Sequence, residues 1–516
     1  PVPWWLLILV ALVLFVLFEY LAMVKRYRRN IQKAKDYGIP FIGQMLYHNS
    51  LLFLIIPEFI GKRFIRREFT FKEEFLQTFE RLNSPLFAVV SSKNIIVYLN
   101  DPQLMKEACV TRKHTIHKAS HLYGVLNIFG ENIVTARDGV EWKKHRVAAN
   151  PAFNEANCAL VCFSTTKNIQ RMAKKWIRNG NQANITEDAT KLTLAVISEA
   201  GFGQEFNLFA KESKTVVDMP SELGFQKSFQ EVMEIVSKHT LMRLSLPKLA
   251  FKVLPLLGFH KVKQVDVCFN EFQRYAEYFA ERKRQELAAS EVSSRKDLLS
   301  LLLDNDTDLT NQDIIADTFM FIVAGHETTA NTINFAFAML ATHPDVQQKV
   351  YEESQRVLGN IEPSEYYSHF AELKYTRAVF EETLRLFPSV VNIPKWATED
   401  TQVGEYIIPG GAQVSLAVYA LHRNEKLWKN SKEFNPERFL ENSQSSVNYK
   451  FIPFSLGQRS CIGRKFALIE AIFTLAIICK DYSFVPKSGD TFNLDLQSIL
   501  TLCTVNPIEI SLSKRE

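Results

Sequence analysis

The residues with the most distinctive chemistry lie in the segment 454–463, which has the sequence FSLGQRSCIG. Its cysteine, Cys461, comes directly before residues 464–478, a stretch that predicts a helix. The start of a helix presents unpaired backbone N–H groups and the positive end of the helix dipole, and both favour a thiolate over a thiol. The position therefore predicts a cysteine that binds its ligand as a thiolate. A cysteine that is simply buried in a turn is the alternative interpretation.

The neighbours of this cysteine suit a flat, anionic ligand. Gly457 and Gly463 permit backbone turns and a close approach of such a ligand. Arg459 supplies a cation, and Phe454 can shield the sulfur. An isolated cysteine would favour the simpler alternative, but the set F-x-x-G-x-R-x-C-x-G is far more specific.

A second group of residues that could take part in catalysis occupies the segment AGHETT at 324–329. Thr328 can bend or open a helix by hydrogen-bonding the carbonyl four residues back, at Ala324. Gly325 allows a close approach of a ligand, and Glu327 places an acid next to the Thr328 alcohol. The alternative is a threonine bonded to its own helix and a glutamate on a solvated face.

A long helix must position this second group, and we predict it over about residues 312–342. Thr310 and Asp313 form a variant of the capping box at its start, and Pro344 ends it. At about 1.5 Å per residue, such a helix spans roughly 45 Å, which is enough to cross a domain.

Two weaker motifs precede the cysteine segment. Glu382 and Arg385 lie three residues apart on a helix that ends before Pro388, so they share one face and can pair. The sequence FNPERF occupies residues 434–439. Taken alone, the first motif is a common solvated pair.

In the order in which they follow along the chain, the four segments resemble the motifs of the cytochrome P450 family, and the resemblance extends over about residues 40–514. The resemblance implies the P450 fold, mainly α with small β-sheets, and haem b (iron protoporphyrin IX) with Cys461 as the iron ligand. It assigns the relay of protons to iron-bound dioxygen to Glu327 and Thr328, and it makes His326 a structural residue.

The same resemblance assigns supporting roles. Glu382 and Arg385 join Arg438 in a buried triad that locks the loop on the cysteine side. Trp142 and Arg146, four residues apart on one helical face, resemble the pair that holds a haem propionate. Lys395 stands where an arginine often follows Ile-Pro, so it offers a point charge instead of a bidentate fork. The full set of cofactor-binding candidates is Cys461, Trp142, Arg146, Arg459, Lys395, Phe454, Gly457, Gly463, Ala324 and Gly325.

The resemblance also predicts a substrate pocket on the far side of the haem. Its walls include the loop at about residues 120–134 and are mostly apolar, which indicates a lipophilic substrate such as a sterol, terpenoid, fatty acid or xenobiotic. A place in the core is the alternative for many of these side chains. The remaining wall candidates are Phe321, Ala324, Val390, Val391, Ile393, Leu500, Thr501 and Leu502.

The first residues predict a membrane anchor. Residues 4–24 carry a single charge, Glu19, and at about 1.5 Å per residue they reach roughly 30 Å, the thickness of a bilayer core. The basic cluster KRYRR follows and would keep the remainder cytosolic. We therefore expect a transmembrane anchor at 3–24, a basic linker at 25–40 and a catalytic domain at 41–516, on the cytosolic side of the endoplasmic reticulum membrane as in microsomal family members. Residues 246–259 are apolar with basic spots and favour a second membrane contact over a place in the core.

Composition supports an ordinary folded protein. The chain has 516 residues, of which 47% are hydrophobic and 23% charged, so a disordered chain is excluded. The net charge of +5 is concentrated after the anchor, which argues against a nucleic-acid binder. Seven cysteines without a CxxC motif argue against a disulfide framework and a structural zinc site. Long helical stretches such as 264–288, with short strands such as 401–408 and 413–419, predict a mainly helical domain with small sheets.

The inferred activity is that of a monooxygenase, which inserts one oxygen atom of O2 into a lipophilic substrate. The resemblance implies electrons from NADPH through a membrane-bound reductase with FAD and FMN, since no nucleotide-binding glycine motif is evident in this chain, and a b-type cytochrome is a further partner of that kind. The candidates for a basic docking surface are Lys143, Lys144, Arg464 and Lys465.

Three rival interpretations stay open. One is a haem-thiolate isomerase or dehydratase acting on peroxides, against which Glu327 and Thr328 argue. The second is a membrane-tethered haem or lipid carrier, which would not consume NADPH. The third is a protein without haem, in which Cys461 is merely buried.

Overall fold

The computed structural model describes residues 3–44, 71–205, 208–209, 224–246, 248–289, 297–304, 308–441, 449–489, 491–498 and 500–515. Pro247 of the expected membrane contact and Glu516 at the end of the expected catalytic domain lie outside these ranges. The chain groups into two compact units. Unit 1 comprises Pro1–Ala119, Val390–Glu433 and Ser443–Ser460, and unit 2 comprises Ser120–Ser389, Phe434–Asn442 and Cys461–Glu516.

Unit 1 is built around a six-stranded sheet with the strand order β1-β2-β3-β9-β6-β4. β2 and β3 are largely apolar on both faces, as expected for strands covered on both sides, and β9 is buried along its whole length. β2 pairs antiparallel with β3, and β3 pairs parallel with β9, so that Val97 lies opposite Val414. The strands are β1 (Phe41–Gly43), β2 (Leu86–Val90), β3 (Ile95–Leu99), β4 (Ile116–Lys118), β6 (Ile393–Ala397) and β9 (Gln413–Leu416), with the separate hairpin β7 (Thr401–Val403) and β8 (Tyr406–Ile408).

Two of these strands are shorter than predicted. The segment 401–408 turns back on itself at Gly404, whose φ of +60° suits a glycine, so it forms a hairpin instead of one strand. β9 ends at Leu416 because residues from Val418 onward form the short helix α16 (Val418–Leu421). The other helices of unit 1 are α1 (Trp4–Asp36), α3 (Glu73–Arg81), α4 (Pro102–Lys106), the single π-turn η3 (Glu107–Thr111) and the 3₁₀ turn η10 (Gly457–Arg459).

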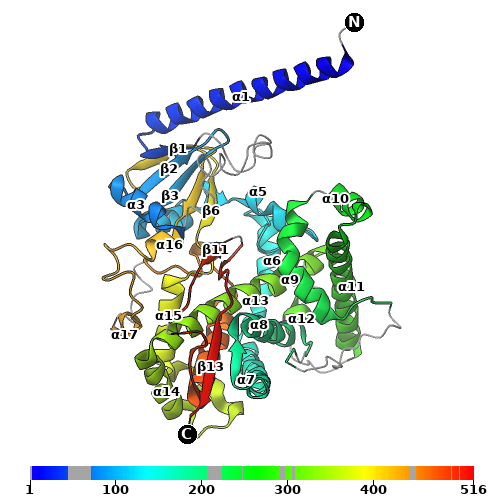
Figure 1. The fold of residues 1–516 in the computed structure, drawn as a ribbon, viewed down its shortest axis with the longest axis vertical. Helices are drawn as coiled ribbons and strands as arrows, with labels where there is room; N and C mark the ends of the chain where they lie inside the picture. The colour runs from blue at the N-terminus through cyan, green and yellow to red at the C-terminus, as the bar shows by residue number, and fades with distance from the viewer. Residues whose placement is uncertain are drawn as a thin grey trace. The chain divides into compact units, whose positions relative to one another are not determined.

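α1 covers both the expected anchor and most of the expected linker. The helix does not end at Val24 but runs through the basic cluster to Asp36, and its C-terminal part lies against the sheet of unit 1 (Figure 1). Asn30 Nδ2 donates to the Ser91 carbonyl at 2.9 Å, and Lys33 Nζ donates to the Gly410 carbonyl at 2.8 Å. No helix among the residues that the structure describes has the length and apolar character of a membrane span. The transmembrane anchor at 3–24 is therefore not confirmed, and the helix found there is a longer one that includes the charged residues.

Unit 2 is mainly helical. Its helices are α5 (Ser120–Tyr123), η4 (Gly124–Leu126), α6 (Val140–Ala149), η5 (Asn150–Ala152), α7 (Glu155–Arg178), α8 (Ile185–Phe202), α9 (Phe229–Ser245), α10 (Lys248–Val253), η7 (Leu254–Leu257), α11 (His260–Ala289), α12 (Leu298–Leu302), α13 (Asn311–Thr342), α14 (Pro344–Leu358), η8 (Pro363–Glu372), α15 (Lys374–Leu386), α17 (Glu437–Glu441) and α18 (Arg464–Asp481). Two small antiparallel sheets accompany them: β10 (Tyr482–Pro486) with β13 (Glu509–Lys514) and β5 (Gln182–Asn184), and the hairpin β11 (Leu496–Ser498) with β12 (Leu502–Thr504).

The long central helix confirms its sequence prediction. α13 begins after Thr310, and both hydrogen bonds of the capping box between Thr310 and Asp313 are present. It ends at Thr342, two residues before Pro344. Most of its side chains are buried, which is why its sequence is apolar nearly all round.

An aromatic cluster forms part of the core beside α13. The Phe129 ring lies edge-on to Phe319 at 5.1 Å between centroids, and Phe272 lies 5.4 Å from each of these two rings. These rings come from the loop before α6, from α11 and from α13, so the cluster holds three elements that are distant in sequence.

Candidate functional site

The predicted thiolate cysteine lies where the sequence places it, three residues before α18. Its side chain is exposed, whereas the cysteines on α7 and α18, Cys158, Cys162 and Cys479, are buried. Burial raises the pKa of the Cys461 thiol, while the N–H groups of Gly463 and Arg464 and the cations of Arg146 and Arg464 act to lower it.

Two effects on the Cys461 thiol oppose each other. The helix start and the cations favour the thiolate, and burial, the larger effect, favours the thiol. A coordinated metal ion deprotonates a thiol outright, so the arrangement fits a cysteine whose thiolate form depends on the metal.

The two glycines of the cysteine segment differ in what they do. Gly457 in unit 1 has φ = +70°, and a Cβ at this position would lie 2.6 Å from the backbone carbonyl oxygen of Cys109. Gly463 has an ordinary φ of −83°, and a Cβ there would meet only the Phe153 ring, at 3.9 Å. The backbone therefore requires glycine at position 457, whereas among the described residues nothing requires it at position 463.

The predicted propionate pair lies on α6 in unit 2. Trp142 is partly buried against the apolar core, and Arg146 is close enough to Cys461 for the two charges to interact. Burial lowers the pKa of Arg146, and the thiolate form of Cys461 would act to raise it. Arg146 thus joins Cys461 within one unit. Arg459 and Phe454 lie in unit 1, together with Lys395, which is buried on β6.

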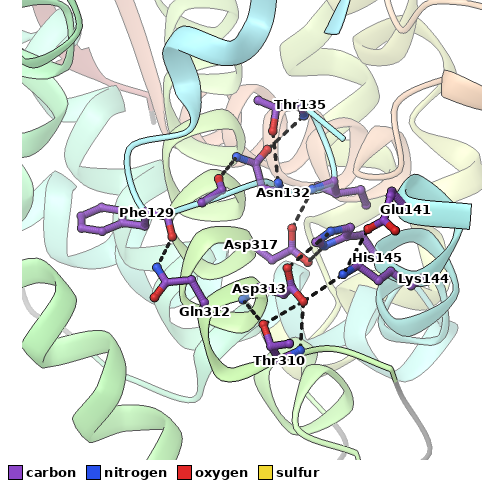
Figure 2. A network of polar contacts seen from close by, with 12 residues as sticks. Phe129, Asn132, Thr135, Glu141, Lys144, His145, Thr310, Gln312, Asp313 and Asp317 are labelled. Carbon is purple, nitrogen blue, oxygen red and sulfur yellow. Dashed lines mark hydrogen bonds and ion pairs between the residues drawn. The ribbon is translucent and has the colours of Figure 1, made fainter. Parts of the chain in front are cut away.

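A buried polar network fixes α6 against α13 (Figure 2). His145 Nδ1 lies 2.7 Å from Asp317 Oδ2, and neither side chain is exposed. The other oxygen of Asp317 accepts the N–H of Ile133 at 2.7 Å. One turn away, Lys144 Nζ forms an ion pair with Asp313 at 3.0 Å. Asp317 therefore connects α13 both to the helix that carries Arg146 and to the loop predicted as a pocket wall.

Sequence reasoning did not find this network. The available signal was Asp317 itself, an acid inside the apolar run IIADTFMF. A buried carboxylate in such a run requires hydrogen-bond donors, but the sequence does not identify them. Burial raises the pKa of Asp317, and its bonds to His145 and Ile133 act to lower it.

The acid–alcohol pair lies on α13 as predicted. Thr328 Oγ1 donates to the Ala324 carbonyl at 2.8 Å, which is the bond expected from the sequence. The Thr328 carbonyl in turn accepts hydroxyl bonds from Thr332 at 2.9 Å and from Ser389 at 3.0 Å. Glu327 Oε1 accepts a hydrogen bond from Thr501 Oγ1 at 2.6 Å, a contact that the sequence analysis missed because it assigned Thr501 only to the pocket wall.

Gly325 and His326, which lie between Ala324 and Glu327, serve the packing of α13. His326 is buried, and its Nδ1 lies 2.7 Å from the Ile322 carbonyl oxygen, in agreement with a structural role. A Cβ on Gly325 would lie 3.3 Å from Ile197 of α8, so this glycine permits the close contact of two helices.

The three charged residues of the expected triad meet in unit 2. Arg385 Nε and Nη2 donate to the two oxygens of Glu382 at 2.7 and 2.8 Å, and Arg438 Nε donates to Glu382 Oε1 at 3.0 Å. The N–H of Asn435 adds a fourth donor to this carboxylate, at 2.9 Å. Glu382 and Arg385 are completely buried, so these hydrogen bonds compensate charges that water does not reach.

The pocket-wall candidates divide between the units. Phe321, Ala324 and residues 500–502 lie in unit 2, whereas Val390, Val391 and Ile393 lie in unit 1. Ala324 is exposed, and Phe321 is buried in the core cluster beside Phe153. Leu502 is completely buried, which favours the core alternative for this residue.

These features define a mainly helical protein with an exposed cysteine before a helix, a cation beside it, and an acid–alcohol pair in its longest buried helix. A family model described as Cytochrome P450 matches residues 57–512, and the chain belongs to that family. The sequence is 31% identical over 452 residues to "Cytochrome P450 monooxygenase 124" of Postia placenta, covering 81% of this chain and 84% of that protein.

Two further similarities place the chain more broadly. It is 31% identical over 417 residues to "Bifunctional cytochrome P450/NADPH--P450 reductase 2" of Bacillus subtilis, covering 79% of this chain and 37% of that protein. The fold is similar to that in "Crystal structure of cytochrome P450DA heme domain", with a TM-score of 0.73 and 23% identity, covering 93% of this chain and 98% of that one. The comparisons thus confirm the P450 fold, mainly helical with small sheets, and support a haem-thiolate monooxygenase in general terms.

The residues of unit 2 fit the haem that the family implies. Cys461 presents an exposed sulfur donor, and Arg146 offers a partly buried cation to an anionic group near that sulfur. When bound, haem with a thiolate ligand supplies the oxidising chemistry that follows cleavage of the O–O bond. Glu327 and Thr328 provide a carboxylate oxygen and a hydroxyl at which protons can be held and transferred.

Proposed function

We propose that this protein is a monooxygenase that inserts one oxygen atom of O2 into a lipophilic substrate, such as a sterol, terpenoid, fatty acid or xenobiotic. The observation that carries the proposal is the combination of Cys461 at the start of α18 with the acid–alcohol pair Glu327 and Thr328 on α13. The apolar character of most wall candidates supports a lipophilic substrate. The acid–alcohol pair favours monooxygenation over the rearrangement of peroxides, which needs no delivered protons.

The test is the absorption spectrum of the reduced, full-length protein under carbon monoxide. We expect a red-shifted Soret band in the wild type and its loss in Cys461→Ala, because only a thiolate ligand gives that band. Cys158→Ala on α7 is the matched control, since this buried cysteine lies outside the site, and it should keep the band. The same ordinary haem spectrum in wild type and Cys461→Ala, or none in either, would contradict the proposal.

Electrons are proposed to come from NADPH through a separate reductase that contains FAD and FMN, with a b-type cytochrome as an additional donor. The name of the Bacillus subtilis relative gives a reductase in the same polypeptide, which supports this source. Among the basic candidates for docking, Lys144 pairs with Asp313 and Lys465 pairs with Glu155, so these two charges are partly neutralised. Lys143 and Arg464 are exposed, which suits both of them to meet an acidic partner.

Attachment to the cytosolic face of the endoplasmic reticulum membrane is part of the proposal. The N-terminal half of α1 supports it with exposed apolar side chains, among them Leu14 at 59% and Phe18 at 67% exposure. Residues 246–259 support a second contact, because Leu256 and Leu257 on η7 are 85% and 67% exposed. Apolar side chains exposed together in this way are typical of surfaces that bind lipid or a partner.

A further inference from the structure

One face of α13 carries a polar stripe that meets the β11–β12 hairpin. Glu327, Asn331 and Asn334 follow the spacing i, i+4, i+7, so they lie on the same side of the helix. Asn331 Nδ2 donates to Thr501 Oγ1 at 3.0 Å, and Asn334 Nδ2 donates to Thr504 Oγ1 at 3.4 Å. The hairpin is thus hydrogen-bonded to the stripe at two points, about one turn of α13 apart.

The first of these two attachment points includes Glu327, the acid of the acid–alcohol pair. Thr501 accepts the Asn331 amide, so its own hydroxyl proton is directed to Glu327 Oε1, 2.6 Å away. The side chain of Thr501 is buried, with 8% exposure, so water competes little for this bond. A hydrogen bond to an ionised carboxylate in such a place is among the stronger ones in proteins.

In this conformation the acid and the alcohol are engaged with different partners. The single hydroxyl proton of Thr328 is donated to the Ala324 carbonyl, and the Glu327 carboxylate receives the Thr501 hydroxyl. The Thr501 bond thus restrains the carboxyl group from which the proposed proton transfer toward Thr328 would start.

The hairpin that holds Thr501 is also tied to the segment after α15. The Leu502 N–H donates to the Ser389 carbonyl at 2.9 Å, and the Ser389 hydroxyl donates to the Thr328 carbonyl at 3.0 Å. Displacement of Thr501 and Leu502 would thus act on both members of the acid–alcohol pair.

We propose that Thr501 is a positioning residue that restrains the Glu327 carboxylate, and that the proton path opens when the Thr501 hydroxyl releases this carboxylate. The proposal rests on the proposed monooxygenase function, because it concerns the delivery of protons in that reaction. It assigns to Thr501 a role in timing, in addition to any contact with substrate.

The first experiment tests the bond itself and needs no turnover. The carboxylate band of Glu327 is identified in the infrared spectrum of the full-length protein by subtracting the spectrum of Glu327→Gln. We expect this band to shift in Thr501→Val, which removes the hydroxyl at nearly constant volume, and to keep its position in Thr501→Ser. Thr504→Val is the matched control, because it removes the second attachment of the hairpin and leaves Glu327 untouched. An unshifted band in Thr501→Val overturns the proposal.

The second experiment tests the restraint. The haem-containing protein is reduced with dithionite and mixed with air-saturated buffer without substrate, so that each ferrous haem gives one electron to O2, which leaves with one proton as the hydroperoxyl radical and then dismutates to O2 and hydrogen peroxide. We expect Thr501→Val to reoxidise about tenfold faster than the wild type, the factor that loss of one hydrogen bond to a charged group would give. Thr501→Ser and Thr504→Val should reoxidise at the wild-type rate.

The double variant Thr501→Val with Glu327→Gln decides whether the effect passes through Glu327. The acceleration should be absent when Glu327→Gln is the reference. The same acceleration in that background, or in Thr504→Val, would show that a loosened hairpin merely admits water, and the proposal would be wrong. A wild type without the carbon monoxide band would refute the proposed function instead, while the infrared comparison would still decide the contact between Thr501 and Glu327.

Discussion

At the scale of single residues, the Glu382 carboxylate is completely buried, so its charge depends on the hydrogen bonds that neighbouring groups donate to it. Replacing Arg385 by Met removes two of these donors and leaves a buried charge only partly compensated. We expect the free energy of unfolding, measured in urea, to fall by about 3 kcal/mol.

The matched control for this variant lies on the same helix. Arg377 pairs with Glu381 at 3.0 Å on the exposed side of α15, and water solvates the arginine well. Arg377→Met should therefore lower the free energy of unfolding by less than about 1 kcal/mol. Equal losses in the two variants would mean that burial of the Glu382 network contributes nothing.

A second buried acid, Glu470 on α18, should make stability depend on pH. Burial raises its pKa well above the usual value, and its Oε1 has no hydrogen-bond partner among the described atoms. The folded protein therefore keeps this proton to a higher pH than the unfolded chain, in which the pKa of a glutamate is about 4.3. As pH rises from there to the folded-state pKa, the free energy of unfolding should fall by about 1.4 kcal/mol per pH unit.

Glu470→Gln tests this dependence because it cannot ionise. Urea unfolding at a series of pH values from 5 upward should show the variant gaining stability relative to the wild type as pH rises. The slope is the diagnostic quantity, since a glutamine also changes the hydrogen bonds at this site by a constant amount. Parallel curves for the two proteins would contradict a raised pKa of Glu470.

At the scale of residues, the sequence predicted which side chains have a role better than it predicted the residues that they contact. The contacts among Glu382, Arg385 and Arg438 could be predicted because their motifs resemble those of a family in which these residues meet. The contact of Thr501 with Glu327 joins residues 174 positions apart, and that of His145 with Asp317 joins residues 172 positions apart. No periodicity within a segment reports such contacts, because they depend on how separate elements pack.

At the scale of elements, the cysteine segment depends on one glycine. Gly457→Ala would have to adopt φ near +70° and would place Cβ 2.6 Å from a backbone carbonyl of η3, which has little freedom to move. We expect this variant to lose haem, as measured by the haem-to-protein ratio after purification, and to lose more than about 1 kcal/mol of stability.

Gly411→Ala separates strain from collision. Gly411 also has a positive φ, +81°, but nothing lies within 4 Å of a Cβ built there. This variant should lose about 1 kcal/mol of stability and retain its haem. A comparable haem loss in both variants would show that backbone strain alone, and not the contact with η3, explains the need for glycine at 457.

Element boundaries were predictable where local chemistry sets them. The capping box and Pro344 define α13, and Leu386 ends α15 two residues before Pro388. The error in the segment 401–408 has a local cause as well, because Gly404 makes a tight turn between two three-residue strands that are too short to show alternation. The extent of α1 was mispredicted because a change from apolar to basic residues does not interrupt a helix.

At the scale of the whole molecule, membrane binding is the proposal with the largest consequence for the behaviour of the protein. Replacing Leu14 and Phe18 on α1 by serine should reduce the fraction of full-length protein that floats with phosphatidylcholine vesicles. Replacing Leu256 and Leu257 should reduce it less, because residues 246–259 expose a shorter apolar segment. Val485→Ser, an exposed apolar residue on β10, is the control and should leave flotation unchanged. Equal flotation of all four proteins would contradict both membrane contacts.

The continuity of α1 has a mechanical consequence. At about 1.5 Å per residue, its 33 residues make a rod of roughly 50 Å, and Asn30, Lys33 and Tyr37 attach its C-terminal end to unit 1. Helices adjust to a bilayer of the wrong thickness by tilting. Since the described helix has no break at Val24, a tilt imposed on its apolar half by the proposed membrane contact would be transmitted to the sheet of unit 1. Bilayer thickness would then act on the orientation of the sheet through a lever, and a flexible linker at the same place would have absorbed that motion.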